Sequence, residues 1–460
     1  MTDLLTGRPA RKISAFCLPL LIGNLFQQLY SMADSVIVGR YMGTQAFAGV
    51  SGTGSLSFLI VGFILGLCSG FAIPAAQDFG AGDEKGVRRV VAHCLWLGAA
   101  ISIGMSVAMY FLTDDLLRLL QTPEDLYQYE YDYIHVIFTG MSVTMLYNML
   151  AGILRAVGDS RTPLYFLVLS CLINIALDVL LIAGVGMGVA GAAWATLCSQ
   201  LISGVLCIGV IRKRFTALIP RGEEWRFSWP VASRELKVGV PMGLQFSITA
   251  IGSVSMTAAI NSLGVNAVAA VGVASKVHSV LGCPMDALGV GMATFASQNL
   301  GAGQTARVRQ GVREMLLIGL AYCAFACLTL AFFGRDMAAL FVDRAEEEVL
   351  SMTAQYLLID GFFFVPLLLI LLLRNTIQGL GYSREAMLAG VFELVGRVVT
   401  AFLLVGRFGF MAVCFASPIA WMAADVLLIT LYRKKMGQLY RWEQARTRYQ
   451  RLKTASQEVQ

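Results

Sequence analysis

Twelve runs of about 20 apolar residues dominate the sequence, and a helix of this length crosses a hydrocarbon core of about 30 Å. Backbone N–H and C=O groups cannot stay unpaired in lipid, so such runs fold as helices. Six runs lie near residues 13–38, 47–74, 89–112, 132–155, 163–184 and 189–211, and six near 237–260, 267–291, 312–333, 353–374, 386–406 and 410–432. The mean hydropathy is +0.69 and 14% of residues are charged, against about 25% in soluble domains. We predict an all-α membrane protein with twelve transmembrane helices.

The basic residues are distributed unevenly between the two sides of these spans. With the N-terminus in the cytoplasm, two of the 35 Lys and Arg residues, Lys276 and Arg397, fall inside spans, and nearly all the others lie on the inner side. Only five fall in outer loops: Arg40, Arg118, Arg335, Arg344 and Arg407. The positive-inside rule therefore predicts a multi-pass protein of the cytoplasmic membrane with both termini in the cytoplasm. The net charge of +6 follows from this orientation, so nucleic acid is not an expected partner.

The two halves of the chain resemble each other. QDFGAGDEKGVRRVV from Gln77 returns as QNLGAGQTARVRQGV from Gln298, and GTQAFAGV from Gly43 returns as GVNAVAAV from Gly264. Six spans per half is an even number, so the two copies enter the bilayer with the same orientation. Parallel repeats of this kind are typical of transporters that rock two helix bundles around a central site. We therefore predict two six-helix lobes.

The limits of these units follow from the spans and from one long polar connection. Residues 1–211 form the predicted N-lobe and residues 237–432 the predicted C-lobe. The linker between them is residues 212–236, which include RKRFTALIPRGEEWRFSWPVASREL. Residues 433–460 form a basic cytoplasmic tail, which we expect to lie against anionic lipid.

Four polar residues of the first half stand out because they lie within apolar spans. A carboxylate at membrane depth costs about 2.5–3.5 kcal/mol on insertion scales. Asp34, Asn174, Asp178 and Thr196 nevertheless fall at similar depths in three spans, if each residue advances about 1.5 Å along its helix. Two carboxylates, an amide oxygen and a hydroxyl suit Na⁺, and a desolvated carboxylate also suits H⁺. The alternative for each carboxylate is a hydrogen bond between helices that has no function.

The repeat separates this polar set from the second half of the chain. At the repeat spacing, Asp34 aligns with Met256 and Asp178 aligns with Ala401. The predicted cation site therefore belongs to the N-lobe alone, and we expect the C-lobe to contribute mainly the wall of the substrate cavity.

The second half has intramembrane charges of its own. Lys276, Glu393 and Arg397 could line a polar cavity in the C-lobe. Glu393 and Arg397 are four residues apart and could instead neutralise each other. Three further acids lie nearer the predicted ends of spans, and we place them at the membrane interface: Asp286, Asp360 and Asp425.

Several segments of the chain resemble the multidrug and toxic compound extrusion (MATE) family. These are MADSVIVGRYMG, QDFGAGD, LRAVGDSRTP and, most specifically, NIALDVLLI followed by GAAWAT, which resembles the DinF-like branch. The resemblance covers nearly the whole chain. It implies that Asp34, Asn174, Asp178 and Thr196 form a cation-linked site and that the cavity lies between the lobes. Acids that other branches carry in spans seven and ten are not evident in ITAIGSVSM and LLLILLLRN, so a second ion site is not expected.

These observations predict a secondary active antiporter, and two other functions stay open. We expect a monomer that exports amphipathic, cationic small molecules or drugs in exchange for H⁺ or Na⁺, surrounded by membrane lipid and without a cofactor. The alternative is a flippase for lipid-linked precursors with the same lobed architecture. A membrane enzyme is the third possibility, but no catalytic residues are predicted because the three histidines show no spacing with acids: His93, His135 and His278.

Overall fold

The computed structural model describes residues 2–120 and 122–458. The helices of the first half are α1 (Pro9–Gly52), α2 (Gly54–Gly80), α3 (Glu84–Leu119), α4 (Glu124–Thr139), α5 (Met141–Ala156), α6 (Arg161–Asp178), the π-helix η1 (Val179–Gly184) and α7 (Val189–Arg214). Two short 3-10 turns follow, η2 (Thr216–Leu218) and η3 (Gly222–Trp225). The second half contains α8 (Trp229–Asn261), α9 (Val265–Gly301), α10 (Thr305–Ala338), α11 (Glu347–Phe362), α12 (Phe364–Gly379), α13 (Ser383–Val399), the π-helix η4 (Thr400–Leu404), α14 (Val405–Phe408) and α15 (Phe410–Glu458).

The helices account for twelve membrane spans in the described part of the chain. Ten helices, some continued by a π-helix or a short α-helix, are individually long and apolar enough to cross a membrane. Two bent pairs, α4 with α5 and α11 with α12, supply the other two spans, with bends of 53° and 51°. No strand occurs among the described residues. The predicted all-α membrane fold is confirmed.

The structural irregularities repeat as the sequence does. The bend between α4 and α5 is at Gly140 and that between α11 and α12 is at Phe363, which are 223 positions apart. Gly43 and Gly264 are 221 positions apart, and both have a left-handed backbone with φ of 85° and 97°, a conformation that glycine adopts without steric cost. The repeat therefore preserves the breaks between helices as well as the helices themselves.

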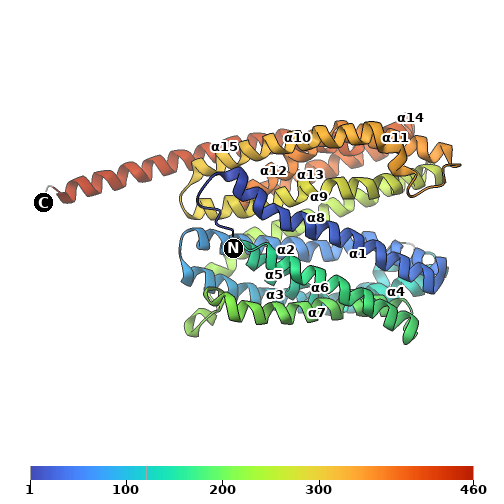
Figure 1. Ribbon diagram of the computed structural model, residues 1–460, viewed down its shortest axis with the longest axis horizontal. Coiled ribbons are helices and arrows are strands. Elements are labelled where there is room, and N and C mark those ends of the chain that lie inside the picture. The colour runs from blue at the N-terminus through green and yellow to red at the C-terminus, as the bar shows by residue number, and fades with distance from the viewer. Residues whose placement is uncertain (1, 121, 459–460) are drawn as a thin grey trace.

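The helices form two bundles, one above the other in Figure 1. One apolar core is built from residues of α2 to α7, and the other from residues of α9 to α15 together with Leu4, Ile13 and Phe16. The start of α1 thus packs on the second bundle, whereas the rest of α1 runs along the first (Figure 1). The residue limits of the lobes remain the prediction made from the sequence.

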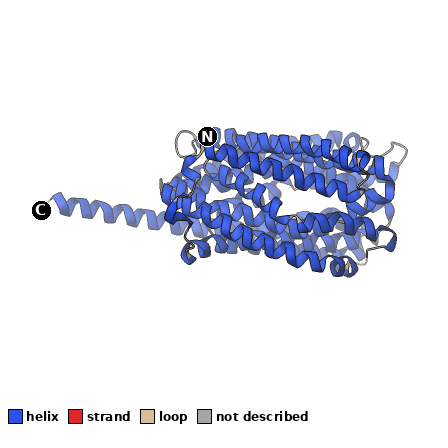
Figure 2. Cartoon of the chain, turned by 90° about the horizontal axis from the view of Figure 1, so that it is seen from below, coloured by secondary structure: helices blue, strands red, loops and turns tan. Residues whose placement is uncertain are grey.

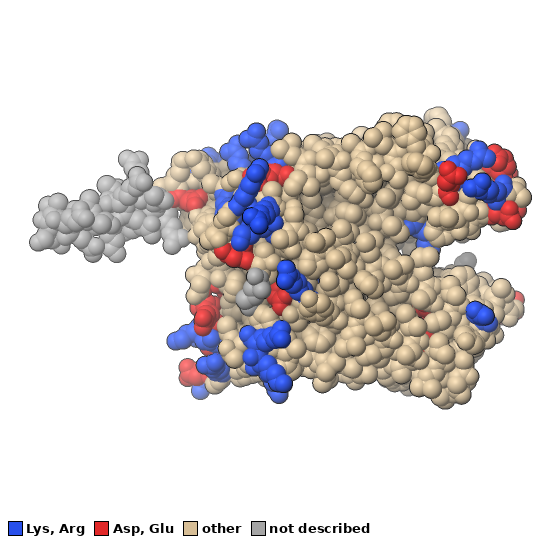
Figure 3. All heavy atoms as spheres, viewed as in Figure 1, with Lys and Arg blue, Asp and Glu red and all other residues tan. Residues whose placement is uncertain are grey.

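Both chain termini lie at one end of the molecule, which we call the terminal end; the opposite end is the distal end (Figures 1 and 2). Lys and Arg side chains gather at the terminal end, and the middle of the visible face is almost uncharged (Figure 3). A cleft separates the two bundles at the distal end (Figure 3). Of the tail predicted from residue 433 onward, α15 continues as a helix to Glu458, but the side chains after residue 445 lie outside the described residues.

The two bundles contact each other through two related helix crossings, α2 with α8 and α1 with α9. A Cβ added to Gly70 on α2 would overlap the backbone of Gly239 on α8. In the same way, a Cβ added to Gly291 on α9 would overlap the sulfur of Cys17 on α1. Gly70 and Gly291 are repeat mates, and so are Cys17 and Gly239. Small residues allow helices in membranes to approach this closely, so backbone packing joins the bundles.

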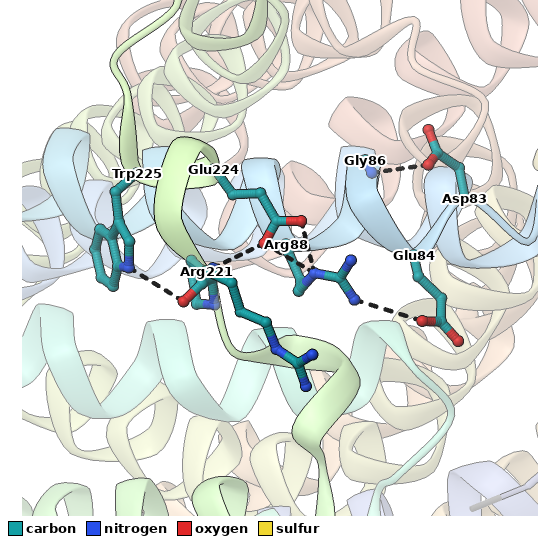
Figure 4. A network of polar contacts seen from close by, with 8 residues as sticks. Asp83, Glu84, Gly86, Arg88, Arg221, Glu224 and Trp225 are labelled. Atoms are coloured by element: carbon teal, nitrogen blue, oxygen red, sulfur yellow. Dashed lines mark hydrogen bonds and ion pairs between the residues drawn. The ribbon is translucent and has the colours of Figure 1, made fainter.

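The connection between the halves is attached to the first bundle at the terminal end (Figure 4). The Nε of Arg88 on α3 donates to both carboxylate oxygens of Glu224 in η3 at 2.8 Å. Glu224 also accepts the backbone N–H of Arg221 at 2.8 Å, and the N–H of Ser228 donates to Nε2 of His93 at 2.8 Å. The linker is therefore held on α3 by charge-assisted hydrogen bonds.

Gly70→Ala tests the helix crossing. The added methyl group must push α2 away from α8, so we expect a loss of about 1–3 kcal/mol in stability and a lower thermal midpoint. Gly104→Ala on α3 is the matched control, because nothing lies within 4 Å of its added Cβ and alanine favours helix formation. Thermal denaturation in detergent measures both variants. Equal midpoints for the two variants would contradict the close crossing.

The pH dependence of linker attachment follows from Glu224. Burial would raise the pKa of Glu224, but hydrogen bonds from Arg88 and from the Arg221 backbone hold this pKa below its ordinary value. A depressed pKa stabilises attachment above the unfolded pKa of about 4.3, and this contribution is lost as pH falls through the lower, folded pKa. Hydrogen exchange of residues 221–228 should increase over that range. Glu224→Gln should abolish this pH dependence of hydrogen exchange. Glu223→Gln, which changes a residue in an exposed ion pair, should keep it. The assignment would be contradicted if Glu223→Gln abolished the pH dependence and Glu224→Gln kept it.

Candidate functional site

Two carboxyl groups meet in the first bundle. Asp34 lies on α1, and Asp178 is the last residue of α6. The two carboxyl groups are near enough to interact electrostatically. Asp178 is fully buried. Asp34 Oδ1 and both oxygens of Asp178 have no hydrogen-bond donor among the described residues, so the site contains carboxylate oxygens with unused capacity to bind a cation.

The hydroxyl of Thr196 on α7 connects this pair to its neighbours. It donates to the carbonyl of Ala192 at 3.1 Å, so it can only accept from the other two groups near it. These are the Tyr30 hydroxyl at 3.1 Å and the Asn174 Nδ2 at 3.4 Å. The amide nitrogen of Asn174 is thereby engaged, and its buried Oδ1 is left without a described donor. The structure thus brings the four predicted residues together, and it leaves four unsatisfied oxygens among them.

Sequence reasoning missed two tyrosines at this site. Tyr30 precedes Asp34 by four residues, so helical spacing could have identified it. Tyr133, on α4, interacts electrostatically with both Asp34 and Asp178, but no spacing in the sequence connects α4 to α1 or α6. Two phenol groups therefore complete the surroundings of the carboxyl pair.

The helix changes form directly after Asp178. The π-helix η1 begins at Val179, and its counterpart η4 begins at Thr400. π-helical turns are rare and are frequent at functional sites. At the repeat spacing Asp178 aligns with Ala401, which lies inside η4, so the deformed backbone is common to both halves and the carboxylate belongs to one. The predicted asymmetry of the polar set agrees with this arrangement.

A cavity of about 220 Å³ adjoins the carboxyl pair inside the first bundle. Tyr30 and Asn174 line its wall and also contact Thr196, whereas neither Asp34 nor Asp178 is among its described lining residues. The remaining polar lining residues come from α1, α5 and α7 and from the start and middle of α6: Asn24, Gln27, Thr144, Tyr147, Asn148, Arg155, Ser160, Ser170, Ser199 and Gln200. A small organic molecule can be bound there next to the carboxyl pair.

No hydrogen bond or ion pair joins the charged residues predicted for the C-lobe cavity to one another among the described residues. Lys276 is exposed on α9. Arg397 is half-buried and donates to Ser253 Oγ at 3.1 Å. The predicted neutralisation of Glu393 by Arg397 is wrong, because Arg374 on α12 reaches Glu393 Oε1 at 2.9 Å and forms a buried ion pair. The base that pairs with Glu393 therefore comes from a neighbouring helix and is not the arginine four residues along α13.

Two of the acids that we placed at the membrane interface are buried among the helices of the second bundle. Asp360 is 2% exposed and Asp425 is 6% exposed. Asp360 Oδ2 lies 2.7 Å from Nδ1 of His278, although these residues are 82 positions apart and the sequence gave no spacing signal. Asp286 is exposed on α9, as expected. The second bundle thus contains its own buried polar pairs, and each recorded pair combines an acid with a base.

The terminal end is closed by a reciprocal pair of hydrogen bonds between the bundles. Gln77 on α2 donates its side-chain N–H to the carbonyl of Gly379 at 3.1 Å, and Gln298 on α9 donates to the carbonyl of Ala156 at 2.7 Å. Gln77 and Gln298 are repeat mates, and so are Ala156 and Gly379. We call these four residues the glutamine clasp. It forms the same bond twice across the pseudo-symmetry axis.

Two glycines allow the glutamine clasp to form. A Cβ at Gly80 would overlap the carbonyl of Gln298, and a Cβ at Gly301 would overlap the carbonyl of Gln77. One further ion pair adds to the closure on one side, between Arg234 Nη1 and Asp78 Oδ1 at 2.7 Å. With the cleft at the distal end and this contact at the terminal end, the cleft is open to one side only.

Two repeated six-span bundles, closed at one end and open at the other, define the class of multi-pass membrane transporters. A family model described as MatE matches residues 19–180 and again residues 241–403, and the chain belongs to this family. The resemblance predicted from the sequence is confirmed, and its DinF-like branch stays a prediction.

Relatives agree in length and fold. The chain is 29% identical over 364 residues to a probable multidrug resistance protein YpnP of Bacillus subtilis, covering 79% of this chain and 80% of that protein. It is 27% identical over 400 residues to an FAD transporter of Shewanella oneidensis, covering 85% and 87%. A solved outward-facing multidrug resistance MATE family transporter has a TM-score of 0.89 at 23% identity, covering 95% of this chain and 98% of that one.

Removing the glutamine clasp should open the terminal end. Each hydrogen bond contributes about 0.5–1.5 kcal/mol, so Gln77→Ala with Gln298→Ala should shift the conformational equilibrium by roughly 5- to 150-fold. Spin labels at exposed Lys213 and Lys434 would report a longer distance between the bundles. Gln310→Ala, whose side chain bonds only within α10, is the control. An unchanged distance distribution in the double variant would contradict a closing role for the clasp.

Proposed function

We propose that the protein is a secondary active antiporter of the cytoplasmic membrane that exports amphipathic, cationic small molecules in exchange for a cation, and that it acts as a monomer. The basic terminal end faces the cytoplasm, as the positive-inside rule requires, and the cleft opens outward (Figure 3). The names of relatives support small-molecule export, since several are multidrug resistance proteins. We propose transport and no catalytic activity.

The single observation that carries the proposal is the pair Asp34 and Asp178, with its unsatisfied oxygens. A ligand can shift the equilibrium between two conformations only by its different affinity for them. A carboxyl pair at membrane depth provides such a difference, because gain or loss of one charge there changes the free energy by several kcal/mol. We propose that the cation binds here from the outside and is released to the cytoplasm, while the substrate leaves in the opposite direction.

The contact between the two carboxyl groups favours H⁺ as the coupling ion. Two neighbouring carboxyl groups away from water repel each other when both are ionised, so the pair favours holding one proton. Na⁺ is the second candidate, because the oxygens of Asp34, Asn174, Asp178 and Thr196 form a hard-ligand set of the kind preferred by such ions. In either case the bound cation neutralises the pair.

The glutamine clasp and the distal cleft describe one of the two conformations that antiport needs. In the other conformation the clasp is broken and the bundles meet at the distal end, as expected for rocking of two repeats around a fixed site. Export of a lipid-linked precursor would use the same movement. The cavity of about 220 Å³ inside one bundle favours a small molecule over a lipid with a large headgroup.

Dye transport in proteoliposomes tests the proposal. With a pH gradient and a Na⁺ gradient imposed separately, we expect one of them, H⁺ first, to drive export of a fluorescent cationic dye by the wild type. Asp178→Asn should abolish gradient-driven transport, because the amide cannot gain or lose a proton. Glu130→Gln removes another buried carboxylate of the first bundle, one that accepts a hydrogen bond from Thr122, and should retain transport.

Two results would refute the coupling role. One is gradient-driven transport by Asp178→Asn at the wild-type rate, and the other is dye movement that neither gradient changes. In the second case, assays with fluorescent lipid would decide whether the protein moves lipid instead.

A further inference from the structure

One side chain in the cavity does not fit a purely cationic substrate. Arg155, in the last turn of α5, lines the cavity of the first bundle. It is the only charged residue among the described lining residues, and neither Asp nor Glu is among them. A ligand in this cavity therefore meets a positive charge directly.

No described carboxylate neutralises Arg155. The groups that act electrostatically on its guanidinium are Tyr147 and Cys68, which are ordinarily neutral near pH 7. Two partly buried arginines elsewhere, Arg88 and Arg374, each have a carboxylate at 2.8–2.9 Å. A cation in the wall of a cavity is costly when no carboxylate pairs with it. The missing counter-charge is thus to be supplied from outside the protein.

The cavity has different electrostatic character at its two ends. Along α6, its lining runs from Ser160, near Arg155, to Asn174, beside the carboxyl pair. Fourteen residues of helix span about 21 Å. The positive guanidinium therefore lies toward the terminal end, and the carboxyl pair toward the distal end. A molecule that bridges these ends has its negative group at Arg155 and its positive group near Tyr30.

The walls between the two ends combine apolar side chains with uncharged polar ones. Asn148 donates to the Thr144 carbonyl at 2.9 Å, and Gln200 accepts from the Thr144 hydroxyl at 2.9 Å. These bonds leave further donors and acceptors of both amides for a ligand. Arginine suits the negative group because its planar guanidinium forms paired hydrogen bonds with carboxylate or phosphate.

We propose that Arg155 binds an anionic group of the transported molecule, a carboxylate or a phosphate, so that the preferred substrates are zwitterionic amphipaths. This inference rests on the proposed transport function and narrows its substrate class. Arg155 is then a residue that determines specificity, whereas the carboxyl pair couples transport to the cation.

A matched pair of dyes tests the inference. Rhodamine B has a free carboxylate and its methyl ester does not, while the cationic xanthene is the same. Binding of each to the purified full-length protein is followed by fluorescence anisotropy. We expect the wild type to bind the acid more tightly than the ester. Arg155→Gln should weaken binding of the acid by roughly 30-fold or more. Its affinity for the ester should be unchanged or higher.

Two further variants control for charge and folding. Arg155→Lys keeps the positive charge and should restore part of the preference for the acid. Arg40→Gln removes one positive charge from exposed α1 and should leave the preference unchanged. If Arg155→Gln does not fold, the ratio of acid to ester affinity in the wild type still tests whether the protein prefers an anionic group, because this measurement needs no variant.

The outcomes separate this inference from the proposed function. Equal affinity of wild type for acid and ester overturns the role of Arg155, and gradient-driven export of the ester then leaves the antiporter proposal standing. Binding of neither dye overturns both. A third result would also overturn the inference: Arg155→Gln loses affinity for phosphatidylglycerol vesicles but keeps the preference for the acid, which would assign the guanidinium to a lipid headgroup.

Discussion

The high cost of charge within a membrane governs the whole arrangement. A carboxylate there must be neutralised by a partner, a proton or a cation. In the second bundle, Glu393 has Arg374 and Asp360 has His278. Asp425, whose Oδ1 has no hydrogen-bond donor among the described residues, interacts electrostatically with the same Arg374. In the first bundle, Asp34 and Asp178 have each other and no described base. Their neutralisation depends on an ion from solution, which is why we place cation coupling in this half of the molecule.

The internal repeat accounts for the contacts and bends that allow the two bundles to move relative to each other. Three structural features occur once in each half of the chain. They are the helix crossings at Gly70 and Gly291, the bends at Gly140 and Phe363, and the two hydrogen bonds of the glutamine clasp. Copies related by an axis along the membrane normal allow one bundle to rock against the other. The repeat leaves the side chains free to differ, and the carboxyl pair and the cavity with Arg155 are found in the first bundle.

The sequence predicted the spans and the meeting of Asp34, Asn174, Asp178 and Thr196, because apolar length and depth along a helix are local properties. It did not predict contacts that depend on how helices are placed side by side. Tyr133 reaches the carboxyl pair from another helix, and Arg374 takes the place that helical spacing assigned to Arg397. The bend at Gly140 was also hidden, since an apolar run continues across it.

The most direct test of the account is whether cation and substrate displace each other at the first bundle. Proton release can be measured with a pH indicator in weak buffer as an amphipathic zwitterion is added to the purified protein. We predict that about one proton leaves the wild type per ligand bound and none leaves Asp34→Asn or Asp178→Asn. Ligand binding to the wild type with no proton release, and with an affinity that neither pH nor Na⁺ changes, would contradict coupling at the carboxyl pair.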